Sequence, residues 1–186
     1  MIVGLDFDNT ILCYDGLFFT LARRLYNYSG GSSKTEVRDW IRREQGEKEW
    51  IRVQGLAYGT HIEEAELFPG VREFFAEASH CELYIVSHKT RFAASEAEED
   101  LHAAARRWLA QSPLKPAGFF LEPTREEKRQ RIASLGCELF LDDLPEFLAE
   151  PGFPTRGVLF DPAGHWPGWE GERITAWSQL PRLVKR

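Results

Sequence analysis

The sequence predicts an α/β protein, a Rossmann-like doubly wound parallel sheet with a small α-helical cap. Short apolar runs alternate along the chain with longer segments of helical periodicity, the pattern of a parallel sheet covered by helices. Polar or charged side chains follow several of these runs directly, at the sheet edge where α/β proteins bind ligands. The first run is followed by about fifty residues of helical pattern, which is too long for one crossover helix and indicates an insertion.

The composition narrows the class of protein. A chain of 186 residues is long enough for one domain, or one domain with a modest insertion, with a core of its own. The net charge of −6 lacks the basic character of nucleic-acid-binding proteins, so we expect no nucleic-acid polymer as partner. No apolar run approaches a membrane span, and the N-terminus lacks a signal-peptide pattern. The three cysteines, Cys13, Cys81 and Cys137, are not spaced like metal ligands. Together with the lack of a membrane span and a signal peptide, they indicate a cytoplasmic protein with reduced thiols and no membrane partner.

The first strand ends in two carboxylates. Residues 2–5 form an apolar run typical of a strand buried on both faces, and Asp6-Phe7-Asp8-Asn9-Thr10 follows. Successive side chains of a strand alternate between its faces, so Asp6 and Asp8 point the same way. Two converging carboxylates repel unless a cation or a shared proton lies between them. For such a short motif alone, a loop aspartate capping a helix is the simpler interpretation, so the rest of the chain must decide.

The predicted cap covers residues 14–67, and the predicted core covers residues 1–13 and 68–186. The cap should contain three helices: one over 16–28, one opened by a capping box of Ser33 and Glu36, and one around Trp50 that ends near Gly55 or Gly59. We interpret this insertion as a lid, and lids usually supply specificity. Its candidate specificity residues are Tyr14, Asp15, Arg23 and Arg24.

The remaining elements return to strand and helix alternation. We expect helices over 71–78, 94–110, from the capping box of Thr124 and Glu127 to 135, and around 174–183, with strands over 83–86, 118–121, 138–141 and 158–160. Chemistry-bearing residues fall beside these strand ends: Ser87 follows the second strand, Lys128 begins a later helix, and Asp142 and Asp143 follow the fourth strand. Each has an ordinary structural explanation alone, but together they predict one site at one edge of the sheet.

These residues carry a resemblance to a known family. Asp6-Phe7-Asp8-Asn9-Thr10, Ser87, Lys128 and Asp142-Asp143, in that order, resemble the four motifs of the haloacid dehalogenase superfamily. The segment 67–71 resembles the point where such proteins return from a helical cap to the core, although this cap is shorter than the usual four-helix one. The dehalogenase branch lacks the second aspartate of the first motif, so Asp8 makes the chain similar to the phosphatase branch. Lys89 is a rival for the phosphate-binding lysine, but Lys128 precedes the strand of the fourth motif, as the pattern requires.

The resemblance implies a Mg²⁺-dependent phosphatase that hydrolyses a small phosphorylated metabolite through an aspartyl-phosphate intermediate. Such chemistry is physically reasonable, because a carboxylate cannot approach a phosphate dianion unless a cation neutralises the charge. The implied nucleophile is Asp6, and the implied general acid and base is Asp8. The implied phosphate-binding residues are Ser87, Lys128 and Thr10, of which Thr10 orients the loop. The implied magnesium ligands are Asp6, the Asp8 backbone carbonyl, and the pair Asp142 and Asp143, with the direct ligand of that pair left open.

Other functions are alternatives to this one. A dinucleotide-binding protein would need glycines after the first strand, and a phospho-acceptor receiver domain has its motifs in another order. A catalytically idle module of the same fold is less favoured, because unneeded buried carboxylates cost stability. A 5′-nucleotidase-type activity on nucleotide monophosphates stays an alternative, with a weak resemblance of residues 158–160 and Trp177 to the tail of deoxyribonucleotidases. The physiological substrate, the oligomeric state, and the roles of His61, His88, Trp166 and Trp169 stay open.

Overall fold

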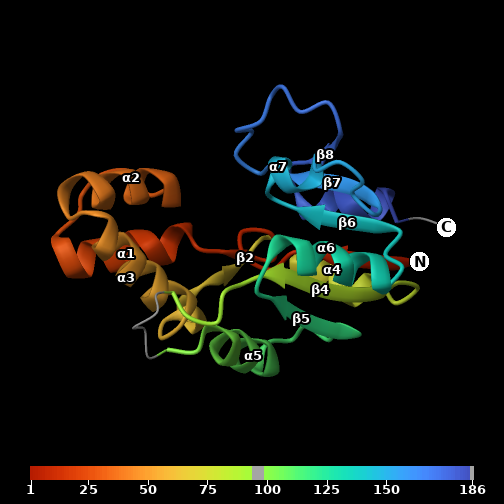
Figure 1. The fold of residues 1–186 in the computed structure, drawn as a ribbon, viewed down its shortest axis with the longest axis horizontal. Coiled ribbons are helices and arrows are strands. Elements are labelled where there is room, and N and C mark those ends of the chain that lie inside the picture. The colour runs from red at the N-terminus through yellow and green to blue at the C-terminus, as the bar shows by residue number, and fades with distance from the viewer. Residues whose placement is uncertain (94–98, 185–186) are drawn as a thin grey trace. The chain divides into compact units, whose positions relative to one another are not determined.

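The computed structural model describes residues 1–93 and 99–184 (Figure 1). The chain divides into two compact units, which are described separately. Unit 1 comprises Met1–Leu12, Leu67–Lys89 and Pro113–Arg186, and unit 2 comprises Cys13–Glu66 and Thr90–Ser112. Within the described ranges, no helix combines the length and the apolar character needed to cross a membrane.

Unit 1 is built on a six-stranded sheet with the order β5-β4-β1-β6-β7-β8, in which every neighbouring pair is parallel (Figure 1). The strands are β1 (Ile2–Leu5), β4 (Glu82–His88), β5 (Gly118–Glu122), β6 (Leu139–Asp142), β7 (Arg156–Phe160) and β8 (Glu172–Ile174). The chain builds outward from β1 through β4 to β5, then crosses to the other side of β1 and builds outward again. The strand order therefore reverses beside β1, which is where doubly wound sheets place their ligands. The predicted fold class is confirmed.

Helical segments cover both faces of this sheet. On one face, α6 (Arg125–Ser134) packs on β4 and β5, and α7 (Pro145–Leu148) packs on β7. The core on this face contains Ile132 of α6 and Leu159 of β7. The next residue, Phe160, points to the opposite face, where its ring lies 6.2 Å from that of Trp177. Trp177 belongs to the 3₁₀ helix η2 (Trp177–Arg182), which packs there with α4 (Val71–Glu77).

A close approach between β1 and β6 explains the glycine in the first strand. A Cβ added at Gly4 would lie 2.4 Å from Cδ2 of Phe140 and 3.0 Å from Sγ of Cys137. The Phe140 ring belongs to the core beneath α6 and α7, where the described neighbours leave no space for a larger residue at position 4. Gly4 is thus needed for packing, two residues before the first carboxylate of the site.

Unit 2 is helical. It contains α1 (Asp15–Tyr26), α2 (Lys34–Glu44), α3 (Glu47–Tyr58), the 3₁₀ helix η1 (Ile62–Glu64) and α5 (Leu101–Gln111). Its core includes Phe18 and Trp50, whose ring centroids lie 5.0 Å apart. Two short strands, β2 (Leu12–Cys13) and β3 (Glu66–Leu67), pair with each other where the chain passes between the units. The predicted capping box of Ser33 and Glu36 forms and opens α2. At the start of α6, Thr124 Oγ1 accepts a bond from the Glu127 N–H and donates one to the Glu127 carboxylate.

The compact units differ from the predicted division in one long segment and by one residue at each end of the cap, Cys13 and Leu67. The predicted core included residues 90–112, which cluster with unit 2, because α5 packs against α3 and η1. Polar contacts join the same parts: Thr60 donates to Glu99 at 3.0 Å, and Arg107 donates to Glu63 at 3.1 Å. Sequence alternation could not show this, since helix 101–111 has the pattern of an ordinary crossover helix.

Several predicted elements need correction. The helix predicted over 94–110 begins at Leu101, because the Asp100 side chain caps its first turn; residues 94–98 lie outside the described part of the chain. The final helix predicted over 174–183 is instead β8 followed by the 3₁₀ helix η2. Strand β8 was missed because Glu172 and Arg173 are exposed at the sheet edge and give no apolar run. The four-residue helix α7 was also missed, being too short for a periodic pattern.

Candidate active site

The first carboxylate is held at the centre of the sheet. The Asp6 backbone N–H donates to the Leu141 carbonyl at 2.9 Å, which continues the β1–β6 ladder past the end of β1. Its side chain is buried, with 5 % of the residue exposed. The chain then turns, with Asn9 in the left-handed region at φ 59° and Ile11 N–H donating to the Phe7 carbonyl at 3.0 Å. This turn brings Asp8 and Thr10 to the same strand end.

Lys128 bridges two of the predicted site acids. Its Nζ donates to Asp6 Oδ1 and to Asp142 Oδ2, each at 2.6 Å, and the residue is 2 % exposed. Lys128 lies in the first turn of α6. The Thr124 side chain caps this helix and so fixes where the helix begins. The ammonium also lies over the rings of Phe140 and Phe147, 5.3 Å and 4.6 Å from their centroids. The site lysine is thus fixed by two charges and two aromatic faces.

Burial and mutual charge shift the pKa values of this group. Burial raises the pKa of Asp6 to about 7; the nearby Lys128 opposes that rise, and the Asp142 carboxylate adds to it. Burial disfavours the Lys128 cation, but Asp142 and Asp6 outweigh it and raise the pKa of the lysine above its usual range. Lys128 is therefore charged at every pH at which the protein is expected to work, whereas Asp6 titrates near neutrality.

Three carboxylates form a candidate cation site. Asp6, Asp142 and Asp143 can each place one oxygen atom so that these atoms all lie within 4.8 Å of one another. The Leu144 N–H donates to Asp142 Oδ1 at 2.9 Å, which orients that carboxylate. Hard oxygen donors in this number suit Mg²⁺, so the residues present fit the predicted cofactor. The predicted contribution of the Asp8 backbone carbonyl stays a prediction.

Acids outnumber lysines among the predicted site residues. Four of these residues are aspartates, namely Asp6, Asp8, Asp142 and Asp143, and two are lysines: Lys89 pairs with Asp8, and Lys128 pairs with Asp6 and Asp142. Such a group of carboxylates is typical of a site for a divalent cation.

The end of β4 supplies two further buried groups. Ser87 is 1 % exposed and Lys89 is 4 % exposed, while His88 between them is exposed. The Lys89 backbone N–H donates to the Glu122 carbonyl at 2.9 Å, so the extended pairing with β5 continues through this residue. The Lys89 ammonium donates to Asp8 Oδ2 at 2.5 Å. The two rival lysines thus pair with different aspartates, and the phosphate-binding roles of Ser87 and Lys128 stay predictions.

Thr10 carries an unsatisfied hydroxyl. Throughout residues 1–93 and 99–184, Thr10 Oγ1 is the one buried side-chain polar atom without a hydrogen-bond partner. An unpaired buried hydroxyl is costly, so it is suited to accept or donate a bond when a ligand arrives. The backbone carbonyl of the same residue accepts a bond of 3.0 Å from the fully buried Trp177 indole. Trp177 therefore anchors the turn that carries the first motif, a role that sequence reasoning missed.

No protein-family model and no curated protein sequence matches the chain. Solved structures do match over nearly its whole length. An L-2-haloacid dehalogenase from Xanthobacter autotrophicus is similar at a TM-score of 0.61 and 12% identity, covering 98% of this chain and 97% of its own. A hydrolase of the haloacid dehalogenase superfamily from Bacillus subtilis, bound to magnesium, reaches a TM-score of 0.60 at 15% identity and the same coverage. A predicted phosphoglycolate phosphatase from Haemophilus somnus reaches 0.60 at 14%, covering 99% and 97%.

The chain has the haloacid dehalogenase-like fold. Among these matches, one is a dehalogenase and one is named as a phosphatase, so the fold does not decide the reaction. That decision must come from the side chains at the edge of the sheet. In this haloacid dehalogenase-like core, the structure brings together acids and lysines at the carboxyl ends of β1, β4 and β6: Lys128 contacts Asp6 and Asp142, Lys89 contacts Asp8, and Asp143 lies beside Asp6 and Asp142.

Three other candidates, His88, His61 and Trp169, have hydrogen-bond partners that are not among the predicted site residues. His88 Nε2 is within 3.2 Å of the Pro123 carbonyl, which is the local hydrogen bond of an ordinary strand-end histidine. His61 Nδ1 pairs with Glu64 at 2.7 Å in unit 2. In the long loop between β7 and β8, Trp169 donates to the Glu172 carbonyl at 3.1 Å, while Trp166 is 46 % exposed.

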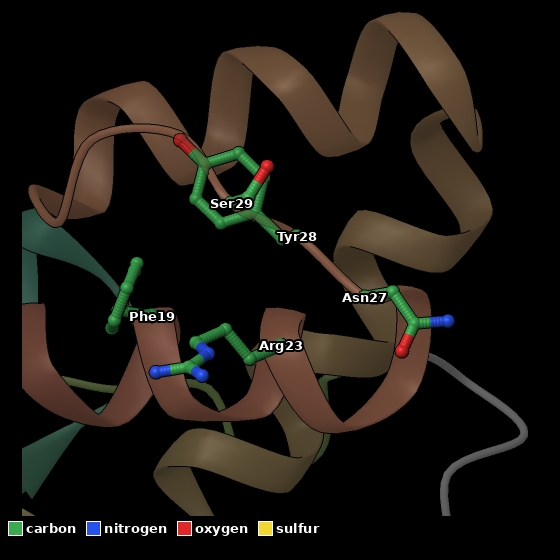
Figure 2. Close-up of a pocket in the computed structure, with 5 residues that line it drawn as sticks. All are labelled: Phe19, Arg23, Asn27, Tyr28 and Ser29. Carbon is green, nitrogen blue, oxygen red and sulfur yellow. The ribbon is translucent and has the colours of Figure 1, made fainter.

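Unit 2 also holds a pocket, which is lined by residues other than those of the four motifs that resemble the haloacid dehalogenase superfamily. It has a volume of about 420 Å³ and is lined by Phe19, Arg23, Asn27, Tyr28 and Ser29 (Figure 2). The Arg23 guanidinium lies 5.6 Å from the centroid of the Phe19 ring. Arg23 was a candidate specificity residue, and a role in substrate selection stays a prediction.

Proposed function

We propose that the protein is a Mg²⁺-dependent phosphatase that hydrolyses the phosphate monoester of a small phosphorylated metabolite. The observation that carries this proposal is the group of three carboxylates, Asp6, Asp142 and Asp143, bridged in part by the buried Lys128. Such a group suits a hard divalent cation beside a carboxylate nucleophile. The presence of Asp8 two residues after Asp6 supports phosphoryl transfer, because an alkoxide leaving group needs a proton donor.

In the proposed reaction, a carboxylate oxygen of Asp6 attacks phosphorus while the bond to the ester oxygen breaks, giving an aspartyl-phosphate. The protonated Asp8 carboxyl gives its proton to the leaving alkoxide. A water molecule then attacks the aspartyl-phosphate, Asp8 takes the proton of that water, and inorganic phosphate leaves with Asp6 restored. Mg²⁺, held by Asp6, Asp142 and Asp143, would neutralise the negative charge that gathers in this site.

The remaining polar groups would bind the phosphoryl oxygens. The charge-assisted donor is Lys128, whose position beside Asp6 suits the point where the phosphoryl group would be transferred. Ser87 and the unpartnered hydroxyl of Thr10 are the neutral donors. These groups would meet the charge that spreads over the equatorial oxygens in the transition state.

Haloacid dehalogenation is the rival reaction on the same fold. A departing halide needs no proton, so that reaction leaves the proton-donating role of Asp8 unused. This point favours the phosphatase.

The test is a panel of esters assayed with Mg²⁺ and with EDTA. We expect phosphate release from p-nitrophenyl phosphate and from at least one sugar phosphate or nucleoside 5′-monophosphate, abolished by EDTA and by Asp6→Asn. A preference for nucleoside monophosphates would select the 5′-nucleotidase-type alternative. Halide release from 2-chloropropionate would select the dehalogenase, and no turnover by a folded, Mg²⁺-binding protein would leave the idle binding module. The cytoplasmic location and the absence of nucleic-acid and membrane partners stay predictions.

A further inference from the structure

Lys89 is an unusual lysine for its position. Immediately after a strand, a lysine normally extends into solvent, yet the Lys89 side chain is only 3% exposed. Its backbone stays extended through the bond to Glu122, so by alternation its side chain points to the same face as that of Ser87. The ammonium reaches across to the turn after β1 and donates to Asp8 Oδ2 at 2.5 Å.

We infer that Lys89 is a positioning residue, which holds the Asp8 carboxyl in the orientation needed for proton transfer to and from the reacting oxygens. This inference rests on the proposed phosphatase function, in which Asp8 is the general acid and base. Proton transfer needs hydrogen-bond distance and direction, and a short aspartate on a turn does not supply these alone. Lys89 supplies them from the neighbouring strand.

The burial of the pair distinguishes it from an ordinary surface ion pair. Exposed pairs contribute little, because water and salt screen them and their side chains lose conformational freedom. Here the side chains are 3% and 17% exposed, so the charge of Lys89 is kept out of water beside that of Asp8. Removing one partner of a buried ion pair leaves the other charge uncompensated, which is strongly unfavourable. Each side chain is therefore held in the orientation in which it reaches the other.

The two site lysines consequently have separate tasks. Lys128 contacts the nucleophile Asp6 and the acid Asp142, so its loss should affect every substrate. Lys89 contacts Asp8, so its loss should matter in proportion to the need for a proton donor. An alkyl phosphate has a poor leaving group that must be protonated, whereas the nitrophenolate of p-nitrophenyl phosphate leaves with little help.

The experiment compares Lys89→Met, Lys89→Gln and Lys89→Arg on the best alkyl phosphate of the screen and on p-nitrophenyl phosphate, with Mg²⁺ saturating. Lys89→Met should lower kcat on the alkyl ester roughly 10- to 100-fold, within the range that general acid–base catalysis contributes, and on the aryl ester no more than about 3-fold. Lys89→Arg, which keeps the charge, should recover most of the alkyl activity. The control is Arg131→Met, which removes the ion pair with Glu122 at 2.8 Å beside the same strand end and should change neither kcat.

A double-mutant comparison separates positioning from a merely structural role. If Lys89 acts through Asp8, then Lys89→Met should cause no further loss of kcat in an Asp8→Asn background. A thermal melt of each variant accompanies the kinetics. Should Lys89→Met fail to fold, Lys89→Gln takes its place, because its amide still donates to a carboxylate and should show the same leaving-group dependence with a smaller loss.

Two results would overturn the inference while leaving the phosphatase intact: equal losses on the alkyl and aryl esters, or a full additional loss in the Asp8→Asn background. If the wild-type protein turns over none of the phosphate esters, the proposed function fails and this inference fails with it. The wild-type rate therefore distinguishes the two failures.

Discussion

Replacing Lys128 by methionine removes the ammonium group from between Asp6 and Asp142 and keeps most of its apolar stem. Both carboxylates lie 2.6 Å from that ammonium, and all three residues are buried. Removing one partner of a buried ion pair typically costs about 3–5 kcal/mol of unfolding free energy. We expect a loss of this size for the metal-free protein at pH 8, which lies above the pKa of about 7 that Asp6 has in the folded protein.

The loss of unfolding free energy in Lys128→Met should be smaller at acid pH. The direction of this pH dependence follows from the pKa of Asp6. Burial raises this pKa from 3.8 to about 7, so between these values the folded protein binds more protons than the unfolded chain. Stability contributed by this group therefore falls as the pH rises from about 4 to about 7. Without Lys128, which holds the pKa of Asp6 down, the pKa rises further; at pH 8 this adds no more than about 1.4 kcal/mol to the loss, because an acid whose pKa lies above the pH stays protonated.

The assay is urea denaturation of the wild type and Lys128→Met in EDTA at pH 5.5 and pH 8. The Arg131→Met variant of the same helix serves as a control, because its ion pair is more exposed. Turnover with Mg²⁺ should fall about 10²-fold or more for alkyl and aryl esters alike, the scale for losing one preorganised charged donor. A Lys128→Met protein as stable as the wild type at pH 8, or equally destabilised at both pH values, would refute the electrostatic account of this site.

Three further predictions follow from the same structure. EDTA should abolish turnover and Mg²⁺ should restore it, while Ca²⁺ should restore it poorly because of its looser coordination; full activity in EDTA would contradict the metal assignment. Asp6→Asn should be inactive on every ester, whereas Asp8→Asn should lose roughly 10²–10⁴-fold on an alkyl phosphate and less on p-nitrophenyl phosphate, with equal losses in the two variants counting against the assigned roles. Gly4→Ala should cost about 1–3 kcal/mol in a urea melt, because its Cβ would lie 2.4 Å from Phe140 Cδ2. The control Gly16→Ala, with nothing within 4 Å of the added Cβ, should be neutral or stabilising, and the opposite ranking would mean that β1 and β6 are less closely packed.

The sheet was predictable where burial produced a pattern in the sequence. Strands β1, β4, β6 and β7 are central or nearly so, and their apolar runs were recognised to within a few residues. Edge strand β8 pairs on one side and has two exposed charged residues, so no local signal marked it. The assignment of helix 101–111 to unit 2 depends on packing against α3, which is a property of the tertiary structure.

The candidate site was likewise predictable in one part and not in another. Asp6, Lys128 and Asp142 were predicted to meet because each lies beside a strand end, and parallel strands bring those ends to one edge. The pairing of Lys89 with Asp8 was not predicted, since a lysine after a strand is usually solvated. The alternation of Ser87 and Lys89 about the exposed His88 was the one available signal. The bond from Trp177 to Thr10 joins residues 167 apart in the chain, and no sequence pattern indicates it.

The two site lysines connect the catalytic groups to the architecture of the sheet. Lys89 ties the end of β4 to the turn after β1, and Lys128 ties α6 to the ends of β1 and β6. These strands are the three neighbours around the reversal of strand order, so the ammonium groups fix the relative positions of all three ends. The acids are consequently preorganised by contacts within unit 1 before any substrate binds, which is the condition for strong electrostatic catalysis. The same contacts contribute to folding, so a lysine variant changes stability and turnover together. The roles of the two lysines can then be distinguished only by how turnover depends on the leaving group and how stability depends on pH. In the proposed function, Lys89 acts on proton transfer and Lys128 acts on the nucleophile and the phosphate.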